Sequence, residues 1–168
     1  QKKLNIIQIS TGEILRQETA AGTDLGLKIK NIIDSGHLIS DDVIVDMLGE
    51  RMDQDDCIRG VILDGFPRTL QQAKTLDQML AGKGLALNHV IEIKVNEEDL
   101  FARIENRAHQ SGGERSDDNA EILRKRLKVY RENTTPLIPY YKGKGVLRSV
   151  NGMAPIGVVA SQIDNLLG

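Results

Sequence analysis

The sequence has a single cysteine, Cys57, among its 168 residues. One thiol cannot form an internal disulfide, and it cannot supply the cysteine cluster of a zinc site. No apolar run approaches the roughly 18 residues that read as a membrane-spanning helix, and the start from Gln1 to Leu4 lacks the apolar segment of a signal peptide. We therefore expect a soluble cytoplasmic protein without membrane contact, in which Cys57 serves as inert packing.

The sequence also lacks an excess of charge of either sign. It has 22 Lys and Arg residues against 24 Asp and Glu residues, a net charge of −2. A broad basic face for binding a nucleic acid polymer is therefore not expected. With 40% hydrophobic residues, the chain can bury one good core, and its length favours a single domain over 1–168.

Short apolar segments alternate with segments of helical periodicity. Strands are predicted at 60–64, 90–95 and 146–150, and a further short apolar piece covers 5–9. Between them lie helices, and this order predicts a parallel α/β sheet. The expected helix starts are Ser10 (in capping-box spacing with Glu13), Thr23 or Asp24, Ser40, Asn96, Asp118 and Pro155, with Gly36 as a stop and Pro136 as a kink or end.

The most informative stretch runs from Leu63 to Thr69. The strand before it reads as buried on both faces, after which Gly65 lets the backbone bend and Pro67 fixes one dihedral angle. Arg68 is thereby held at a strand end, where a guanidinium suits a bidentate grip on phosphate. Asp64 can orient that arginine or hold Mg²⁺ through water. The alternative is an ordinary strand-to-helix turn with a solvated arginine.

Further arginines are spaced so that they can converge on the same ligand. Arg107 lies at the end of a predicted helix, and Arg115 and Arg126 are eleven residues apart, about three helical turns. Several arginines around one cleft indicate a highly anionic ligand and a phosphoryl-transfer site. For the remaining helix arginines, Arg103, Arg124 and Arg131, we expect solvated surface charges.

Three blocks together resemble the successive signatures of adenylate kinases. They are Gln8 to Arg16, Asp64 to Thr69 with Gln72, and Arg115 to Asp118 with Arg126, and the resemblance runs through essentially the whole chain. The block around Arg68 is highly specific to nucleoside monophosphate kinases. The resemblance implies a P-loop NTPase-like α/β fold, a three-layer parallel sheet with helices on both faces, and reversible transfer of the γ-phosphoryl of ATP to AMP.

The resemblance also implies roles for individual residues. Arg68 would hold the AMP phosphate and Gln72 would read adenine, while the segment 10–39 would form a moving AMP-binding flap. The AMP-binding positions by this resemblance are Thr11, Arg16, His37, Leu38, Ile39, Gly65, Phe66, Pro67, Arg68, Gln72, Arg115 and Arg126.

On the ATP side, Arg107 resembles the arginine at the lid's edge, and the backbone at Ala154 resembles the part that faces the ATP adenine. Asp117 and Asp118 match the pair that locks a closed lid, here the very short segment 107–116, which has no cysteines and so excludes the zinc-bearing form. Arg68, Arg107, Arg115 and Arg126 would be the catalytic set. Mg²⁺ would enter with ATP, and the protein would work as a monomer.

The sequence departs from the family at the phosphate loop, G-x-x-x-x-G-K-[ST]. Gly82-Lys83 and Gly143-Lys144 have neither a glycine five positions earlier nor Ser or Thr afterwards. We therefore expect that the first strand and this loop, roughly twenty residues, are absent from the chain, which would leave neighbouring strands unpaired and apolar surface exposed. Without the loop we expect catalysis to fall by orders of magnitude.

Two alternatives stay open. The chain can be a truncated, catalytically silent nucleotide-binding module that keeps the AMP clasp. Within the enzyme class, a pyrimidine monophosphate kinase acting on UMP or CMP is the rival, against which Thr11 and Gln72 favour adenine by resemblance.

Overall fold

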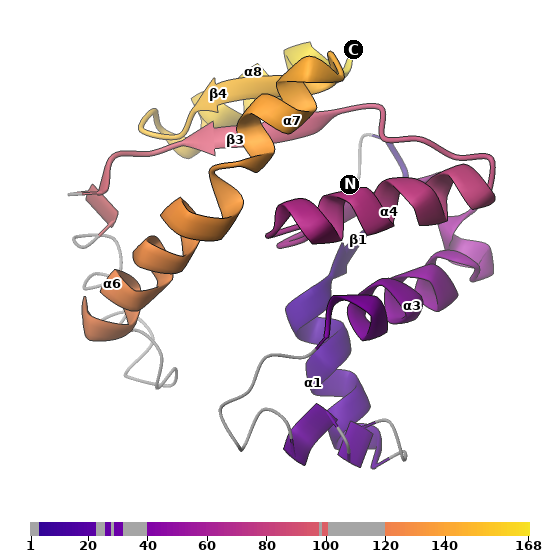
Figure 1. The fold of residues 1–168 in the computed structure, drawn as a ribbon. Coiled ribbons are helices and arrows are strands. Elements are labelled where there is room, and N and C mark those ends of the chain that lie inside the picture. The colour runs from indigo at the N-terminus through magenta and orange to yellow at the C-terminus, as the bar shows by residue number, and fades with distance from the viewer. Residues whose placement is uncertain (1–3, 23–25, 28, 32–39, 98, 101–119) are drawn as a thin grey trace. The chain divides into compact units, whose positions relative to one another are not determined.

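A computed structural model describes residues 4–22, 26–27, 29–31, 40–97, 99–100 and 120–168, without the side chains of 120–123 and 126 (Figure 1). By their contacts the residues divide into two compact units, Gln1–Ala86 and Leu87–Gly168. The expectation of a single domain over 1–168 stays a prediction.

The first unit is built on two parallel strands, β1 (Ile7–Ser10) and β2 (Val61–Asp64). Their register pairs Ser10 with Asp64, so both strands end at the same edge of the sheet. Helix α1 (Thr11–Ala21) begins directly after β1, and helix α4 (Leu70–Gly82) follows a short loop after β2. The register therefore places the start of α1 beside the loop that leads into α4.

Two further elements complete the first unit. Helix α3 (Asp41–Met52) lies alongside α4 (Figure 1), and the 3-10 helix η1 (Asp55–Cys57) leads from α3 toward β2. The helices meet through apolar side chains spaced three and four residues apart, as the sequence pattern predicts for α4. The buried apolar residues of this unit are Ile9, Ile29, Val45, Met47, Leu48, Cys57, Phe66, Ala73, Leu76 and Leu80.

The predicted strand at 60–64 is confirmed as β2, but its burial was overestimated. Val61, Ile62 and Leu63 are half-buried. Among the described residues β2 pairs with β1 alone, so the two-stranded sheet cannot cover β2 as a central strand of a larger sheet is covered.

The predicted helix starts at Ser10 and Ser40 are correct in position and wrong in mechanism. Both serines occupy the N-cap positions of α1 and α3, but neither side chain makes a capping hydrogen bond. A side-chain cap is found instead at Thr69, whose hydroxyl accepts from the Gln72 N–H at 3.1 Å. The expected cap at Thr23 or Asp24 and the stop at Gly36 lie outside the described residues.

The second unit pairs two further parallel strands, β3 (Val90–Lys94) and β4 (Leu147–Asn151). Both confirm predicted strands to within one residue. After β3, the Asn96 side chain accepts from the Asp99 N–H at 2.8 Å, as expected for a helix cap. The buried apolar residues of this unit are Leu137, Tyr141 and Val150.

A broken helix leads to β4. Helix α6 (Ala120–Val129) continues as the π-helix η2 (Tyr130–Thr134), and helix α7 (Leu137–Gly143) begins directly after Pro136. The Thr135 N–H donates to the Tyr130 carbonyl at 2.9 Å, a five-residue spacing that marks the wide turn. The predicted break at Pro136 is confirmed, because η2 ends before this residue and α7 begins after it. The physical reason is that proline has no N–H to donate to the preceding turn. The predicted start at Asp118 lies outside the described residues.

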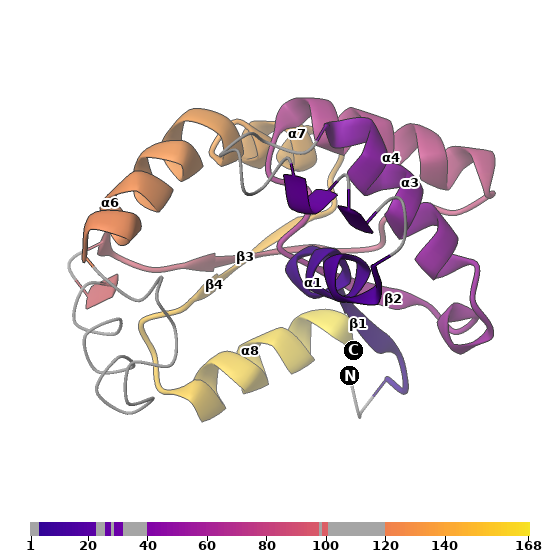
Figure 2. The ribbon, with the colours of Figure 1, turned by 90° about the horizontal axis from the view of Figure 1, so that it is seen from below.

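Helix α8 (Ile156–Leu167) closes the chain and packs against β4 in both ribbon views (Figures 1 and 2). It begins one residue later than predicted, because Pro155 has an extended ψ of 148° and so acts as the N-cap. Its apolar face is incompletely covered: Val159, Ile163 and Leu166 are half-buried, and Ile156 is 90% exposed.

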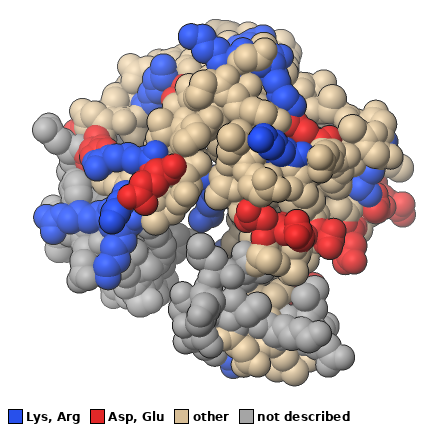
Figure 3. Space-filling view, in the orientation of Figure 1, with Lys and Arg blue, Asp and Glu red and all other residues tan. Residues whose placement is uncertain are grey.

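The described residues therefore form an α/β protein with parallel strands, as predicted, arranged as one two-stranded sheet in each unit. Basic and acidic side chains are interspersed on the face in view (Figure 3). In the part of the chain that the structure describes, none of the helices combines the length and the apolar character needed to cross a membrane.

Candidate functional site

The candidate site lies where β1 and β2 end. Since Ser10 pairs with Asp64, the next residues, Thr11 and Gly65, emerge side by side. The Thr11 hydroxyl, which is buried, donates to the Gly65 carbonyl at 3.5 Å. This contact joins two segments that are 54 residues apart in sequence, and it sets α1 against the loop that carries Arg68.

Gly65 makes the tight turn that the sequence predicts. Its φ of +74° lies in the left-handed region that favours glycine, and a Cβ there would come within 3.0 Å of Arg68 Nη2. The Gly65 carbonyl also accepts from Arg68 Nε at 2.7 Å. This contact anchors Arg68 Nε at an exposed position beside the strand end, which confirms that Arg68 is held.

Gln72, on the first turn of α4, extends the contacts away from the strand edge. Its side chain is 7% exposed, and its Oε1 accepts from the Arg68 N–H at 2.7 Å. Its Nε2 donates to Asp41 Oδ1, on the first turn of α3, at 2.6 Å. A continuous series of hydrogen bonds therefore runs from Thr11 through Gly65, Arg68 and Gln72 to Asp41.

We call this series the clasp network, and its members come from four segments: α1, the loop after β2, α4 and α3. It brings together four residues that the resemblance assigns to AMP. Of the other assigned residues, Arg16 is exposed on α1, Phe66 is buried and Pro67 is half-buried after a cis peptide bond.

The Asp64 carboxylate has a different partner from those the sequence suggested. Its Oδ2 accepts from Gln8 Nε2 at 2.6 Å, a contact between β2 and β1. Asp64 is exposed at the end of β2. No three His, Cys, Asp or Glu side chains within the described ranges gather as a metal-binding group.

In the second unit, Ala154 lies in the turn between β4 and α8. Its N–H donates to the Asn151 carbonyl at 3.4 Å, and the Asn151 side chain accepts from the Met153 N–H at 3.0 Å. Gly152 is buried in the same turn and donates to the Lys94 carbonyl at 2.8 Å, which fixes the turn on the end of β3.

The remaining predicted residues are not placed by this structure. Arg126 lies in α6, and its side chain is not described. The convergence of arginines therefore stays a prediction. Eight residues named in the predictions lie outside the described ranges: His37, Leu38, Ile39, Arg103, Arg107, Arg115, Asp117 and Asp118. All of the lid 107–116 and part of the flap 10–39 also lie outside them.

Arg131, expected to be a solvated surface charge, is exposed but ion-paired. Its Nε donates to Glu97 Oε1 at 2.8 Å, and its Nη2 contacts the other carboxylate oxygen. The hydrogen bond from Arg131 lowers the pKa of the Glu97 carboxyl from its ordinary value. Arg124 is exposed on α6.

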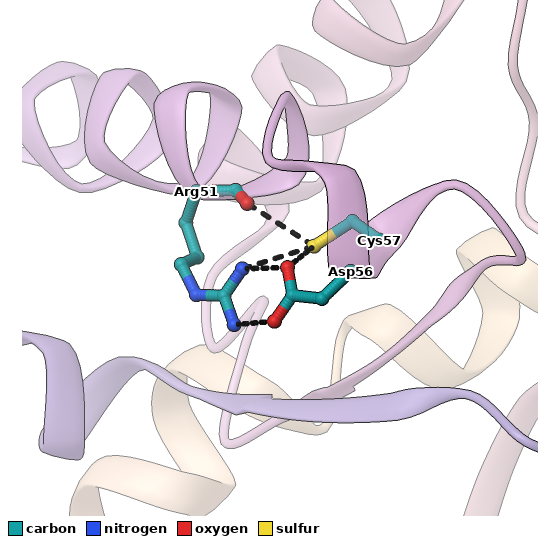
Figure 4. A network of polar contacts seen from close by, with 3 residues as sticks. All are labelled: Arg51, Asp56 and Cys57. Atoms are coloured by element: carbon teal, nitrogen blue, oxygen red, sulfur yellow. Dashed lines mark hydrogen bonds and ion pairs between the residues drawn. The ribbon is translucent and has the colours of Figure 1, made fainter.

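A second polar cluster, which the sequence analysis did not single out, surrounds Cys57 (Figure 4). The two terminal nitrogens of Arg51 bind the two carboxylate oxygens of Asp56 at 2.8 and 2.7 Å. The Cys57 thiol donates to the Arg51 carbonyl at 3.1 Å, and Arg51 Nη1 lies 3.1 Å from Cys57 Sγ. Burial is the main cause that raises the pKa of the Cys57 thiol, so the packing role expected for this residue fits its surroundings.

A pocket of about 220 Å³ lies beside β1, and no member of the clasp network lines it. Its lining contains no residue that the sequence analysis assigned to AMP or ATP. It is lined by Gln8, Ile9, Ser10, Glu13, Ile14, Gln17 and Arg51.

Asp41 is the member of the clasp network that sequence reasoning missed. A Ser-Asp-Asp run at a helix start reads as ordinary capping and dipole compensation, and nothing in its spacing shows that α3 lies beside α4. Only the packing of the two helices brings Asp41 to Gln72, 31 residues away.

Comparison with known proteins gives a consistent result over nearly the whole chain. The family model described as adenylate kinase matches residues 1–146. The adenylate kinase of Parvibaculum lavamentivorans is 50% identical over 164 residues, which cover 97% of this chain and 80% of that protein. The adenylate kinase of Brucella ovis is 49% identical over 170 residues, which cover 99% of this chain and 88% of that protein.

Proposed function

This chain belongs to the adenylate kinase family, and we propose that it transfers the γ-phosphoryl group of ATP to AMP, with AMP held by the clasp network. The observation that carries the proposal is the series of hydrogen bonds from Thr11 to Asp41 around Arg68. It brings together a cation for the phosphate and a buried amide for the base. An ordinary turn with a solvated arginine needs neither feature.

The clasp residues divide the work of holding AMP. Arg68 grips the AMP phosphate, because the planar guanidinium suits a phosphate and its Nε is held in place by the Gly65 carbonyl. Gln72 reads the adenine edge with its amide, and Thr11 fixes α1 beside the turn. Arg16 and the segment His37 to Ile39 complete the clasp by the family resemblance.

The reaction itself is a displacement at phosphorus. An oxygen of the AMP phosphate forms a bond to the γ-phosphorus of ATP, the bond from that phosphorus to the β,γ-bridging oxygen breaks, and ADP leaves as the second ADP forms. Arg107, Arg115 and Arg126 offset the charge of the transferring group. Asp117 and Asp118 lock the lid 107–116, which excludes water while the flap 10–39 closes on AMP.

The second unit supplies the ATP side in this proposal. The turn at Ala154 presents its backbone to the ATP adenine, and its attachment to the end of β3 keeps it in place. The three-layer parallel sheet of the P-loop NTPase type, which the family resemblance implies, stays a prediction. A cytoplasmic location and a monomeric state stay predictions.

Mg²⁺ enters with ATP, and the described residues fit a hydrated cation that has few direct protein ligands. Mg²⁺ keeps several waters and is bound through phosphates and one or two carboxylates. Asp64, exposed at the end of β2, is the carboxylate that can meet such a hydrated ion. When bound, Mg²⁺ neutralises charge on the ATP phosphates.

The test concerns the phosphate loop, since this sequence contains no G-x-x-x-x-G-K-[ST] segment. We expect a version with a strand and a G-x-x-x-x-G-K-[ST] phosphate loop joined ahead of Gln1 to form ADP from ATP and AMP. The same version with alanine for the loop lysine should be slower by about 10² or more, because the lysine and loop amides hold the ATP phosphates. ADP is measured in a coupled assay.

A well-folded version with the loop that forms no ADP would reject the proposal and favour a silent nucleotide-binding module. The same assay with CMP and UMP as acceptors addresses the pyrimidine alternative. If CMP or UMP is turned over faster than AMP, the site prefers a pyrimidine, and adenine is not the base that Gln72 reads.

A further inference from the structure

Gln72 is held at both ends of its amide. Its oxygen accepts from the Arg68 N–H at 2.7 Å, and its nitrogen donates to the Asp41 carboxylate at 2.6 Å. The side chain is 7% exposed, so water does not readily replace either partner. These contacts go beyond what a helix start requires, because the Thr69 hydroxyl already caps α4 through the Gln72 backbone N–H.

The two partners allow one orientation of the amide. A backbone N–H can only donate and a carboxylate oxygen can only accept, so turning the amide by 180° would place donor against donor and acceptor against acceptor. The orientation of a glutamine amide is otherwise easily exchanged, because its oxygen and nitrogen ends are nearly equal in size. Asp41 and the Arg68 backbone together remove that freedom.

The fixed orientation matters for the base that Gln72 can read. With both ends engaged, one N–H and one oxygen lone pair remain to face a ligand. Adenine offers a 6-amino donor beside the N1 acceptor, whereas a 6-oxopurine offers an oxygen acceptor beside an N1–H donor. A freely turning amide could pair with either edge, but an amide held in one orientation pairs well with only one.

We propose that Asp41 is a positioning residue that fixes the Gln72 amide and so makes the site select adenine over 6-oxopurine monophosphates. This inference rests on the proposed function, because it requires that Gln72 faces the base of AMP. Asp41 acts through Gln72 and need not touch the nucleotide. The Arg68 N–H assists it from the other end of the amide.

The adjacent residue separates this role from simple support of α3. Asp41 and Asp42 are both acidic residues of the first turn, where a carboxylate stabilises a helix through its dipole. Asp41 is half-buried against Gln72, and Asp42 is exposed. Asp42→Ala therefore removes a helix-start charge without touching the clasp network, and it is the matched control for Asp41→Ala.

The experiment measures the dissociation constants of the 168-residue chain for AMP and for inosine monophosphate by calorimetric titration. We expect the unsubstituted chain to prefer AMP. Asp41→Ala should weaken AMP binding about tenfold and change inosine monophosphate binding less, so that the preference for AMP falls at least about fivefold. Asp41→Asn keeps an oxygen that can accept from Gln72 and should retain the preference within about twofold, as should Asp42→Ala.

A merely structural role for Asp41 would weaken both nucleotides equally, and equal losses in Asp41→Ala would overturn the inference while AMP binding by the unsubstituted chain leaves the proposed function standing. Binding of neither nucleotide by the unsubstituted, folded chain would overturn both. Thermal melts establish that each variant is folded. If Asp41→Ala does not fold, Asp41→Ser takes its place with the same expectation, because serine suits a helix start and its shorter side chain withdraws the oxygen from Gln72.

Discussion

Arg68 is positioned by a carbonyl group that the turn itself provides. The left-handed conformation of Gly65 turns its carbonyl toward the following residues, where Arg68 Nε and the Thr11 hydroxyl both donate to it. The sequence predicted the turn at Gly65 and the fixed position of Arg68. It did not predict this anchor, because a backbone acceptor leaves no mark in the residue pattern.

Replacing Arg68 tests the phosphate role directly. In the version with the phosphate loop, we expect Arg68→Ala to lower kcat/KM for AMP by about 10² or more, because a bidentate charged contact to the phosphate is lost. Arg131→Ala is the control. It breaks only the exposed ion pair with Glu97 and should change the rate less than about twofold. Equal effects of the two substitutions would refute the assignment.

Cys57 should behave as a buried thiol. We expect iodoacetamide at pH 8 to modify it at least about tenfold more slowly in the native chain than in urea, because burial limits access and raises the thiol pKa. The same pKa change means that Cys57 favours the folded state less as the pH rises above the ordinary thiol value of about 8.5. Mass spectrometry measures the modification, Cys57→Ser gives the background, and equal rates in both states would contradict the assignment.

At the scale of the element, the turn between β4 and α8 depends on one close approach. A Cβ on Gly152 would lie 2.5 Å from Ile93 Cγ2, 2.7 Å from Val95 Cγ1 and 2.9 Å from the Lys94 carbonyl oxygen. The last of these is backbone and cannot swing aside. The turn can therefore stay against the end of β3 only with glycine at this position.

We expect Gly152→Ala to lower the free energy of unfolding by about 1–3 kcal/mol, through overpacking of the turn. Gly157→Ala in α8 is the matched control, since no atom lies within 4 Å of its added Cβ, and it should stabilise the helix by up to about 1 kcal/mol. Urea denaturation followed by circular dichroism gives both values. A Gly152→Ala chain as stable as the unsubstituted one would show that the turn relaxes freely.

The elements themselves were largely predictable, for reasons that differ along the chain. The strands at 90–95 and 146–150 were found from apolar runs with turn residues at their ends, and the break at Pro136 follows from a missing N–H. The start of α8 was one residue off, because a proline at a helix start can be the cap or the first helical residue. The burial of β2 could not be predicted, since it depends on how many strands lie beside it.

At the scale of the whole molecule, the family was accessible from sequence, and the AMP side of the site stays a prediction from the same resemblance. The block from Asp64 to Thr69 is specific, and its residues stand close together in the chain. Asp41 was not accessible, because its contact with Gln72 requires knowing that α3 lies beside α4. The ATP side, with Arg107, Arg115 and Arg126, stays a prediction from resemblance.

The pairing of β1 with β2 has a consequence for how the site tolerates change. Since Ser10 lies opposite Asp64, the hydroxyl at position 11 meets the carbonyl at position 65 only in this alignment. An insertion of one residue between Ile7 and Gln8 would leave the block from Gln8 to Arg16 unbroken, yet it would turn the following part of the strand over and carry α1 about 3 Å along it. A homologue with such an insertion would keep each signature intact and still lose the contact between positions 11 and 65.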